Sequence, residues 1–213
     1  MSESDVIVGV TGASGAIYAR ALIRELLTQG LTVHLIPSAH AALVWQDELG
    51  EAAADGAPAQ NETVAPTGWA AWLAVPADQR DRLIIHDPPN MATLPASGTF
   101  CVRAMVVAPC SMNTLAKIAH GISDTLLTRA AAARLKERQP LILVPRETPL
   151  SLADCRNLTA AAEAGAIILP AMPGFYKQPE TIDDLVRFLV SKICDQLRLP
   201  CSETSRYGGE KGS

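Results

Sequence analysis

The chain of 213 residues is long enough for one domain with a sizeable core, so its stability requires neither disulfides nor a structural metal. Charged residues make up only 19% of it and hydrophobic residues 48%, a balance that indicates surface buried against other subunits. A formal net charge of −4 argues against a nucleic-acid binder, which would carry a basic surface.

The cysteines and the start of the chain both favour a cytoplasmic location. The five cysteines include no C-x-x-C pair and indicate reduced thiols, and the four histidines have no metal-ligand spacing. Residues 1–5 are acidic, unlike the basic start of a signal peptide, and no apolar stretch approaches the roughly 20 residues of a membrane helix. We therefore expect no metal site and no membrane segment.

Short apolar runs alternate with helix-length segments along the chain. The runs are bounded by glycine, proline or polar residues and predict buried strands at 6–10, 33–36, 83–85, 105–108, 141–144 and 166–169. The remaining segments predict helices at 15–29, 38–48, 111–120, 125–138, 151–164 and 181–198. This alternation predicts an α/β fold: a single-domain, doubly wound parallel sheet of Rossmann-like or flavodoxin-like type, with helices on both faces. Aspartate three residues after Ser151 and Thr181 predicts a capping box at two helix starts.

One segment departs from this alternation. Residues 50–80 are rich in alanine and proline and contain Trp69 and Trp72. We expect a loop with one short helix that packs on a neighbour, inserted within a single domain that spans residues 1–213. Residues 199–213 form a polar C-terminal tail.

Ligands of open parallel sheets bind beyond the carboxyl ends of the strands, so the residues that follow each strand are candidates for a site. After the first strand, residues 11–16 have the sequence Thr-Gly-Ala-Ser-Gly-Ala and open a helix, whose free N–H groups favour an anion. Their spacing does not match the dinucleotide fingerprint G-x-G-x-x-G. The turn predicts an anion or cofactor site, and a tight strand-to-helix connection is the alternative. Ser38, after the second strand, fits an ordinary N-cap.

Polar side chains also follow the fourth and fifth strands. Ser111, Asn113 and Thr114 stand in the first turn of a helix, where their side chains and the free N–H groups make a phosphate cradle. A helix that is merely capped needs one such residue and not three. Arg146 and Glu147 follow the fifth strand, where the guanidinium can grip a phosphate and the carboxyl can move a proton. A structural ion pair is the alternative for these two.

Helix 125–138 carries basic residues of two kinds. Arg129 stands near its N-terminus, where a cation is electrostatically unfavourable, which indicates a partner anion, either a ligand or a nearby aspartate. Lys136 follows seven residues later on the same face. We expect Arg134 and Arg138 to lie on a solvated face.

Assembled, the motifs resemble those of UbiX-type flavin prenyltransferases. The matching stretches are residues 11–16, 109–114, 127–131, 135–138, 143–149 and 173–176, and the string Leu-Val-Pro-Arg-Glu-Thr-Pro at 143–149 is highly specific. The resemblance covers about residues 5 to 208, apart from 50–80. It implies that the chain binds reduced FMN and attaches a dimethylallyl group from dimethylallyl monophosphate to flavin N5 and C6, without a metal. It also implies a homo-oligomer, usually a dodecamer with active sites at subunit contacts, and a UbiD-type decarboxylase as recipient of the prenylated FMN.

The resemblance also assigns roles to residues of this chain. Contacts to FMN fall on Gly12, Ala13, Ser14, Ser38, Ser111, Met112, Asn113, Thr114 and Arg129. The residues that would bind the prenyl phosphate are Lys136, Arg146, Tyr176 and Lys192, and those that would act in catalysis are Glu48, Glu147 and Ser14. Cations would stabilise the phosphate as it leaves, and Glu147 would pass it a proton. Glu48 or the released phosphate would remove the proton at C6.

This sequence differs from many family members at two positions, and two other functions are alternatives to a flavin prenyltransferase. Asn113 stands where many members have Lys, and Lys192 where several have Arg, which keeps the charge and loses the bidentate grip. One alternative is an FMN-dependent cysteine decarboxylase, because residues 109–121 are similar to the Pro-Ala-Ser-Ala-Asn-Thr motif of those enzymes and His86 is available as the histidine they need. The other is a non-catalytic FMN-binding partner subunit. The sequence does not distinguish a monophosphate from a pyrophosphate donor.

Overall fold

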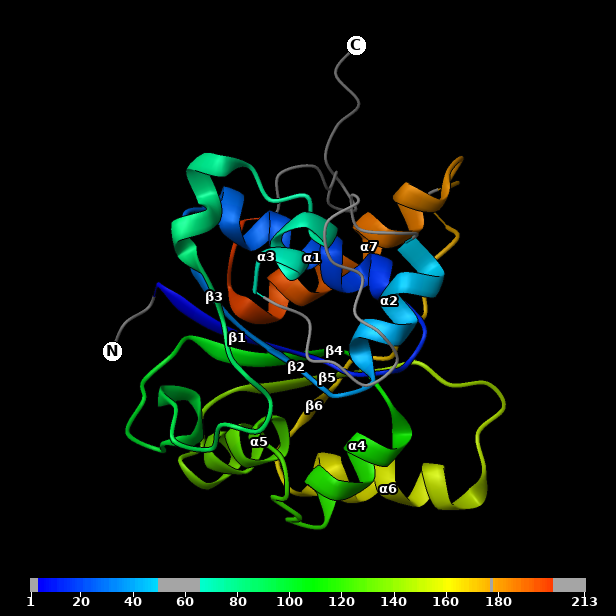
Figure 1. Ribbon diagram of the computed structural model, residues 1–213. Helices are drawn as coiled ribbons and strands as arrows, with labels where there is room; N and C mark the ends of the chain where they lie inside the picture. Colours follow the sequence, from blue (N-terminus) through cyan, green and yellow to red (C-terminus); the bar gives the residue numbers. More distant parts are fainter. Residues whose placement is uncertain (1–3, 50–65, 177, 201–213) are drawn as a thin grey trace.

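A parallel sheet forms the middle layer of the computed structural model, which describes residues 4–49, 66–176 and 178–200 (Figure 1). Its strands are β1 (Asp5–Val10), β2 (Thr32–Pro37), β3 (Leu83–Ile85), β4 (Ala104–Cys110), β5 (Leu141–Pro145) and β6 (Ile167–Ile168). Within the described residues the order is β3-β2-β1-β4-β5-β6, and all neighbouring strands are parallel. The predicted fold class is confirmed, and the strand order reverses between β1 and β4, as in Rossmann folds.

Helices cover both faces of the sheet (Figure 1). One face carries α1 (Ala16–Thr28), α2 (Ala41–Leu49), α3 (Pro66–Trp72) and α7 (Ile182–Leu197). The other carries α4 (Met112–Ala119), α5 (Leu126–Lys136) and α6 (Leu152–Glu163). The short 3-10 helices η1 (Ala77–Arg82) and η2 (Leu94–Ala96) precede and follow β3. Among the described residues, we find no helix with the length and apolar character needed to span a membrane.

The sheet is buried on both faces, which explains why its strands are continuous apolar runs and do not alternate with polar residues. In β1, Val6, Val8 and Val10 pack into the core beneath α1 and α7, whereas Ile7 packs into the core formed with α4 and α5. Both cores are mainly aliphatic, as the low aromatic content predicts.

Hydrogen bonds at the helix starts fix where the chain turns back along the sheet. Both predicted capping boxes are confirmed: the Ser151 hydroxyl accepts from the Asp154 N–H at the start of α6, and the Thr181 hydroxyl accepts from the Asp184 N–H at the start of α7, each at 3.2 Å. A third box at α5 is made by two threonines, which a search for an acid at the third position misses. Helix α2 begins at Ala41, three residues later than predicted.

The short helix expected within residues 50–80 is α3, and its neighbour is α2 of the same chain. The rings of Trp69 and Trp72 lie against Trp45 of α2, with centroid separations of 5.1 and 6.5 Å. Residues 50–65 of this segment and 201–213 of the C-terminal tail lie outside the described residues. Helix α3 therefore belongs to the core of this chain.

Arg134 corrects the expectation of a solvated basic face on α5. Its side chain is fully buried (0% exposed) and donates to the main-chain oxygens of Ser97 and Phe100, both at 2.6 Å. Burial lowers the pKa of this guanidinium. The connection around η2 has carbonyl oxygens that lack a donor in any strand or helix, and a guanidinium can satisfy two of them at once. Arg138 is exposed, as predicted.

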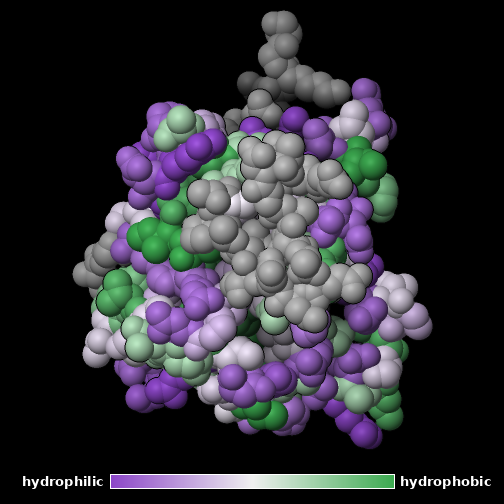
Figure 2. Space-filling view, in the orientation of Figure 1, coloured by the Kyte–Doolittle hydropathy of each residue, from purple (hydrophilic) through white to green (hydrophobic). Residues whose placement is uncertain are grey.

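Apolar side chains reach the surface in separate patches among polar ones (Figure 2). Within the described residues, three of the most exposed follow β5 and β6: Leu152 is 66% exposed, and Met172 and Phe175 are each 69% exposed. Large apolar side chains at a sheet edge favour contact with another molecule, in agreement with the low charge density of the sequence.

Candidate active site

Thr11 joins the turns that follow β1 and β4, the two strands between which the sheet order reverses. Its buried hydroxyl donates to the Pro109 main-chain oxygen at 2.8 Å and accepts from the N–H groups of Ser111 at 2.9 Å and Ala13 at 3.3 Å. These bonds use the donor and both lone pairs of the hydroxyl. Thr11 was not among the predicted site residues, although a lone hydroxyl at the end of an apolar strand signals such a role.

Two glycines let the turn after β1 approach its neighbours closely. A Cβ atom on Gly12 would lie 2.9 Å from Cβ of His40, which follows β2. Gly15 has a φ of +116°, and a Cβ atom there would lie 2.9 Å from Cδ2 of Tyr18. The turn therefore packs closely on residues that follow β2 and on the first turn of α1, with Ser14 half-buried between the two glycines.

Glu48 lies on this turn, although it comes from the last turn of α2. Its carboxylate accepts from the N–H of Gly15 at 2.9 and 3.0 Å and from the N–H of Ala16 at 2.8 Å. These N–H groups begin α1 and have no partner within the helix, so they form an anion-binding position. The predicted catalytic carboxylate is thus held beside Ser14 by backbone groups of the predicted cofactor turn.

The turn after β4 opens α4 with the predicted cradle residues. The Ser111 hydroxyl accepts from the Thr114 N–H at 3.3 Å and donates to the Thr114 hydroxyl at 3.0 Å. The Met112 side chain is buried in the core, which leaves its backbone N–H to face the turn, and Asn113 is exposed. Ser38 is half-buried, and its N–H donates to the Val10 oxygen at 2.7 Å, which ties the turn after β2 to β1.

Arg146 and Glu147 follow β5 at the same edge. The Arg146 N–H donates to the Cys110 oxygen at 3.4 Å, and its buried Nε has no hydrogen-bond partner in the described part of the chain. Burial raises the pKa of the Tyr18 phenol, and the positive charge of Arg146 acts in the opposite direction, so these two side chains are close. Glu147 is exposed and accepts from the Thr148 N–H at 3.1 Å. A buried guanidinium nitrogen without a partner suits an anionic ligand.

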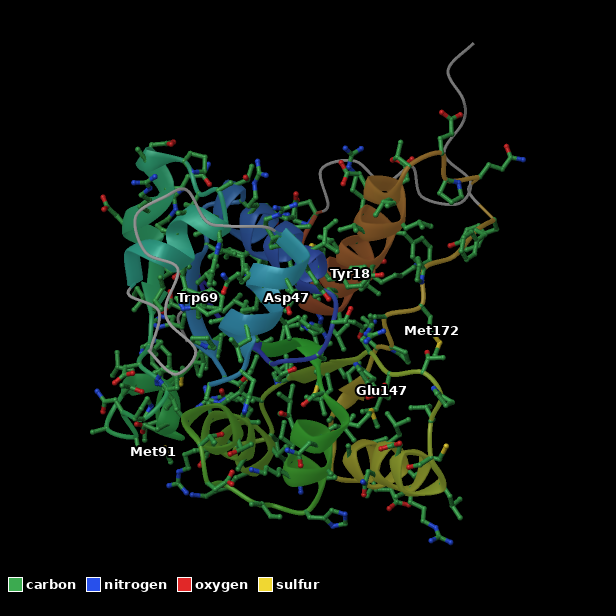
Figure 3. The ribbon with its side chains drawn as sticks, turned by 45° about the vertical axis from the view of Figure 1, so that its right-hand side comes forward. Tyr18, Asp47, Trp69, Met91, Glu147 and Met172 are labelled. Atoms are coloured by element: carbon green, nitrogen blue, oxygen red, sulfur yellow. The ribbon has the colours of Figure 1, made fainter. Side chains whose placement is uncertain are left out.

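Tyr176 and Lys192 both lie against Phe188, which the sequence did not indicate as a site residue. Phe188 of α7 lies 5.7 Å from the Tyr176 ring, and Lys192 Nζ lies 5.8 Å from the Phe188 ring centroid. Phe188 precedes Lys192 by four residues on one helix, a spacing that places both on the same face. The loop after β6 is tied to β5 by a bond from the Ala171 N–H to the Pro145 oxygen, and Figure 3 shows Met172 and Glu147 on neighbouring loops.

Lys136 is not part of this group within one chain. It ends α5, and Pro140, four residues further along, accepts from the Met105 N–H at the start of β4, so Lys136 lies near the amino ends of the strands. Strand β5 runs between Lys136 and Arg146 and rises by about 13 Å at 3.3 Å per residue. The two residues therefore lie at opposite ends of the strand. The Lys136 side chain is 79% exposed, with Nζ 3.6 Å from a Glu137 carboxylate oxygen. Arg129 is exposed two turns earlier on α5.

His86 contacts His34 and lies away from the turns that follow β1 and β4. Its Nε2 lies 3.0 Å from Nδ1 of His34, and the two rings stack with centroids 5.3 Å apart. Burial and, to a smaller extent, the neighbouring His34 lower the pKa of His86 to about 4. His86 follows β3 at the outer edge of the sheet, two strands from the β1–β4 crevice. The described residues contain no cluster of three or more His, Cys, Asp or Glu side chains that could hold a metal.

A Rossmann-ordered sheet with a glycine-containing turn between β1 and the helix that follows it is the arrangement typical of proteins that bind phosphorylated ligands. The Flavoprotein family model matches residues 1–194. The flavin prenyltransferase UbiX of Synechocystis sp. is 43% identical over 208 residues, covering 97% of this chain and 98% of that protein. The chain therefore belongs to the Flavoprotein family and, within it, to the UbiX-type flavin prenyltransferases.

Solved structures agree with this assignment. AnUbiX (PadA1), solved in complex with FMN and dimethylallyl pyrophosphate, superposes with a TM-score of 0.80 at 31% identity, covering 98% of this chain and all of that one (100%). The dodecameric FMN-dependent UbiX-like decarboxylase from Escherichia coli O157:H7 superposes with a TM-score of 0.78 at 36% identity, covering 95% of this chain and 100% of that one.

Proposed function

We propose that this chain transfers a dimethylallyl group from a dimethylallyl phosphate to N5 and C6 of reduced FMN. The observation that carries the proposal is the likeness, over 98% of the chain, to AnUbiX, whose structure holds both FMN and dimethylallyl pyrophosphate. The near full-length relatives described as flavin prenyltransferases support the same activity.

The residues of the crevice fit a flavin phosphate and a prenyl phosphate. The turn after β1 stands at the start of α1, where a helix N-terminus favours an anion, and the buried Arg146 Nε has no hydrogen-bond partner among the described residues and can bind one. FMN is assigned to Gly12, Ala13, Ser14, Ser38, Ser111, Met112, Asn113, Thr114 and Arg129. When bound, reduced FMN supplies the nucleophilic N5 and C6 atoms.

The chain's own groups handle charge and protons. Arg146 and Lys192, with Tyr176, hold the prenyl phosphate and stabilise its negative charge as the C–O bond breaks. Glu147, exposed on the adjoining loop, donates a proton to the leaving phosphate. Glu48 receives the proton released from C6, and Ser14 acts beside it in the same turn.

The position of Lys136 supports a multi-subunit enzyme. Because it lies near the amino ends of the strands of its own sheet, Lys136 contributes to a prenyl-phosphate site only when another copy presents it. We propose a homo-oligomer, and specifically a dodecamer like the Escherichia coli neighbour. The reaction needs no metal, and its product passes to a UbiD-type decarboxylase.

The cysteine decarboxylase alternative has less support. The candidate histidine, His86, pairs with His34 at the far side of the sheet, where its lowered pKa keeps it neutral. The non-catalytic alternative predicts flavin binding without turnover.

One experiment separates these functions. The purified protein is incubated anaerobically with reduced FMN and dimethylallyl monophosphate or, in parallel, dimethylallyl pyrophosphate, and the mass of the extracted flavin is measured. A flavin heavier by one prenyl unit supports the proposal and identifies the donor. Recovery of unmodified FMN with both donors overturns it.

A further inference from the structure

The three tryptophans of the chain form one compact group, which we call the tryptophan cluster (Trp45, Trp69 and Trp72). Trp45 is 0% exposed, and the Trp69 and Trp72 rings lie 5.3 Å apart on the last turn of α3. Trp45 meets the Trp69 ring edge to face, at 5.1 Å and an angle of 71°. Edge-to-face contacts of this kind fix the relative orientation of the elements that carry the rings. The cluster therefore joins α2 to α3.

Trp45 is the largest buried side chain of helix α2. Ala41 is also fully buried, and Ala42 and Leu49 pack against the same core while partly exposed. Helices of nine and seven residues are marginal without packing partners. The indole N–H groups of Trp45 and Trp72 are buried without a hydrogen-bond partner among the described residues, a cost to stability that an aliphatic side chain would avoid. The ring contacts thus hold α2 at the expense of two unpaired donors.

The active-site carboxylate depends on this placement. Glu48 follows Trp45 by three residues, about one turn along α2 and on an adjoining face. It stands in the last turn of its helix, where the helix dipole disfavours a carboxylate. The N–H groups of Gly15 and Ala16 offset this repulsion at 2.8 to 3.0 Å, and they do so only while α2 is held against the start of α1.

We propose that the tryptophan cluster is a positioning device that holds the Glu48 carboxylate on the Gly15 and Ala16 N–H groups for the proton-transfer step. This inference rests on the proposed prenyltransferase function and on Glu48 acting in it. Trp69 and Trp72 are buried against Trp45 and act through it and the helix that carries it.

A double-mutant cycle tests the inference. Prenylated-flavin formation is followed for the wild type, Trp69→Leu, Glu48→Gln and the double variant, with kcat and KM for the prenyl donor measured for each. We expect Trp69→Leu to lower kcat by about tenfold with KM changed less than about twofold, because ligand contacts remain. In the Glu48→Gln background the same change should lower kcat by less than about twofold, because the group being positioned is gone.

A matched control separates positioning from general destabilisation. Leu26 is buried in the same core on α1, about 15 Å along the helix from Ala16, so Leu26→Ala should lower Tm and multiply with Glu48→Gln. Trp69→Phe keeps a ring and should restore most of kcat, and Trp72→Leu replaces Trp69→Leu in the cycle if that variant does not fold. Equal fold-losses from the Trp69 change in both backgrounds, or no loss from Glu48→Gln alone, would overturn the inference. A wild type that forms no prenylated flavin would instead overturn the proposed function.

Discussion

Replacing Thr11 by valine tests whether one hydroxyl holds the two halves of the site together. The change keeps the shape of a side chain that is 1% exposed and removes three hydrogen bonds. The Pro109 oxygen retains a bond from the Thr11 N–H at 3.3 Å, so it is not left unpaired. The N–H groups of Ser111 and Ala13 lose their acceptor.

The expected magnitude follows from these two donors. A buried donor without a partner costs about 1–3 kcal/mol, and the Ala13 bond is already long at 3.3 Å. We therefore expect Thr11→Val to lower the free energy of unfolding by about 2–4 kcal/mol, a large part of the ~5–15 kcal/mol typical of a domain. Because the turns after β1 and β4 then move apart, FMN affinity should also fall.

Urea unfolding of the apo protein measures the loss, and flavin fluorescence titration measures the affinity. Thr11→Ser is the matched control, since it keeps the hydroxyl and loses one methyl group at a cost of about 1 kcal/mol. The reasoning is refuted if Thr11→Val unfolds within about 0.5 kcal/mol of wild type, or if the serine variant is the less stable of the two.

Three further predictions address the catalytic edge, the buried arginine and the histidine pair. Glu147→Gln should slow prenylated-flavin formation by about 100-fold while leaving the FMN dissociation constant unchanged, and an unaltered rate would remove Glu147 from the reaction. Arg134→Met should lower the free energy of unfolding by about 1–3 kcal/mol, because the Phe100 oxygen loses its donor while the Ser97 oxygen keeps only the bond from the Phe100 N–H at 3.3 Å; a urea midpoint equal to wild type would contradict this. His86 has a pKa of about 4 in the folded chain against 6.5 ordinarily, so the unfolded chain binds its proton first and stability should decline as pH falls from about 6.5 towards 4. The urea midpoint of the His86→Asn variant should vary less across that pH range. Equal pH dependence in the variant and the wild type would contradict the lowered pKa of His86.

The sequence was sufficient for elements whose signals are local. Strand β3 was predicted at its observed residues, and the capping boxes at Ser151 and Thr181 marked the starts of α6 and α7 correctly. The turn after β1 was recognisable because small residues between a strand and a helix permit close backbone approach. These features depend on residues within a few positions of one another.

Features that depend on distant partners were not predictable in the same way. The residues near Arg134 in the sequence do not indicate that its guanidinium will bond to the Ser97 and Phe100 oxygens. A charged side chain was therefore predicted to lie on the surface. Phe188 became relevant only when α7 brought it beside the loop after β6. Lys136 and Arg146 are ten residues apart, yet they lie at opposite ends of the intervening strand. Strand and helix direction, which the fold decides, controls which candidates meet.

The confinement of every tryptophan to the α2–α3 contact gives this protein an intrinsic spectroscopic reporter. Indole emission, which can be excited selectively at wavelengths that tyrosine does not absorb, originates within one contact between two short helices. Because the helix bearing Trp45 also bears Glu48, emission lifetimes recorded with flavin bound would follow the surroundings of this proposed catalytic carboxylate without any attached label.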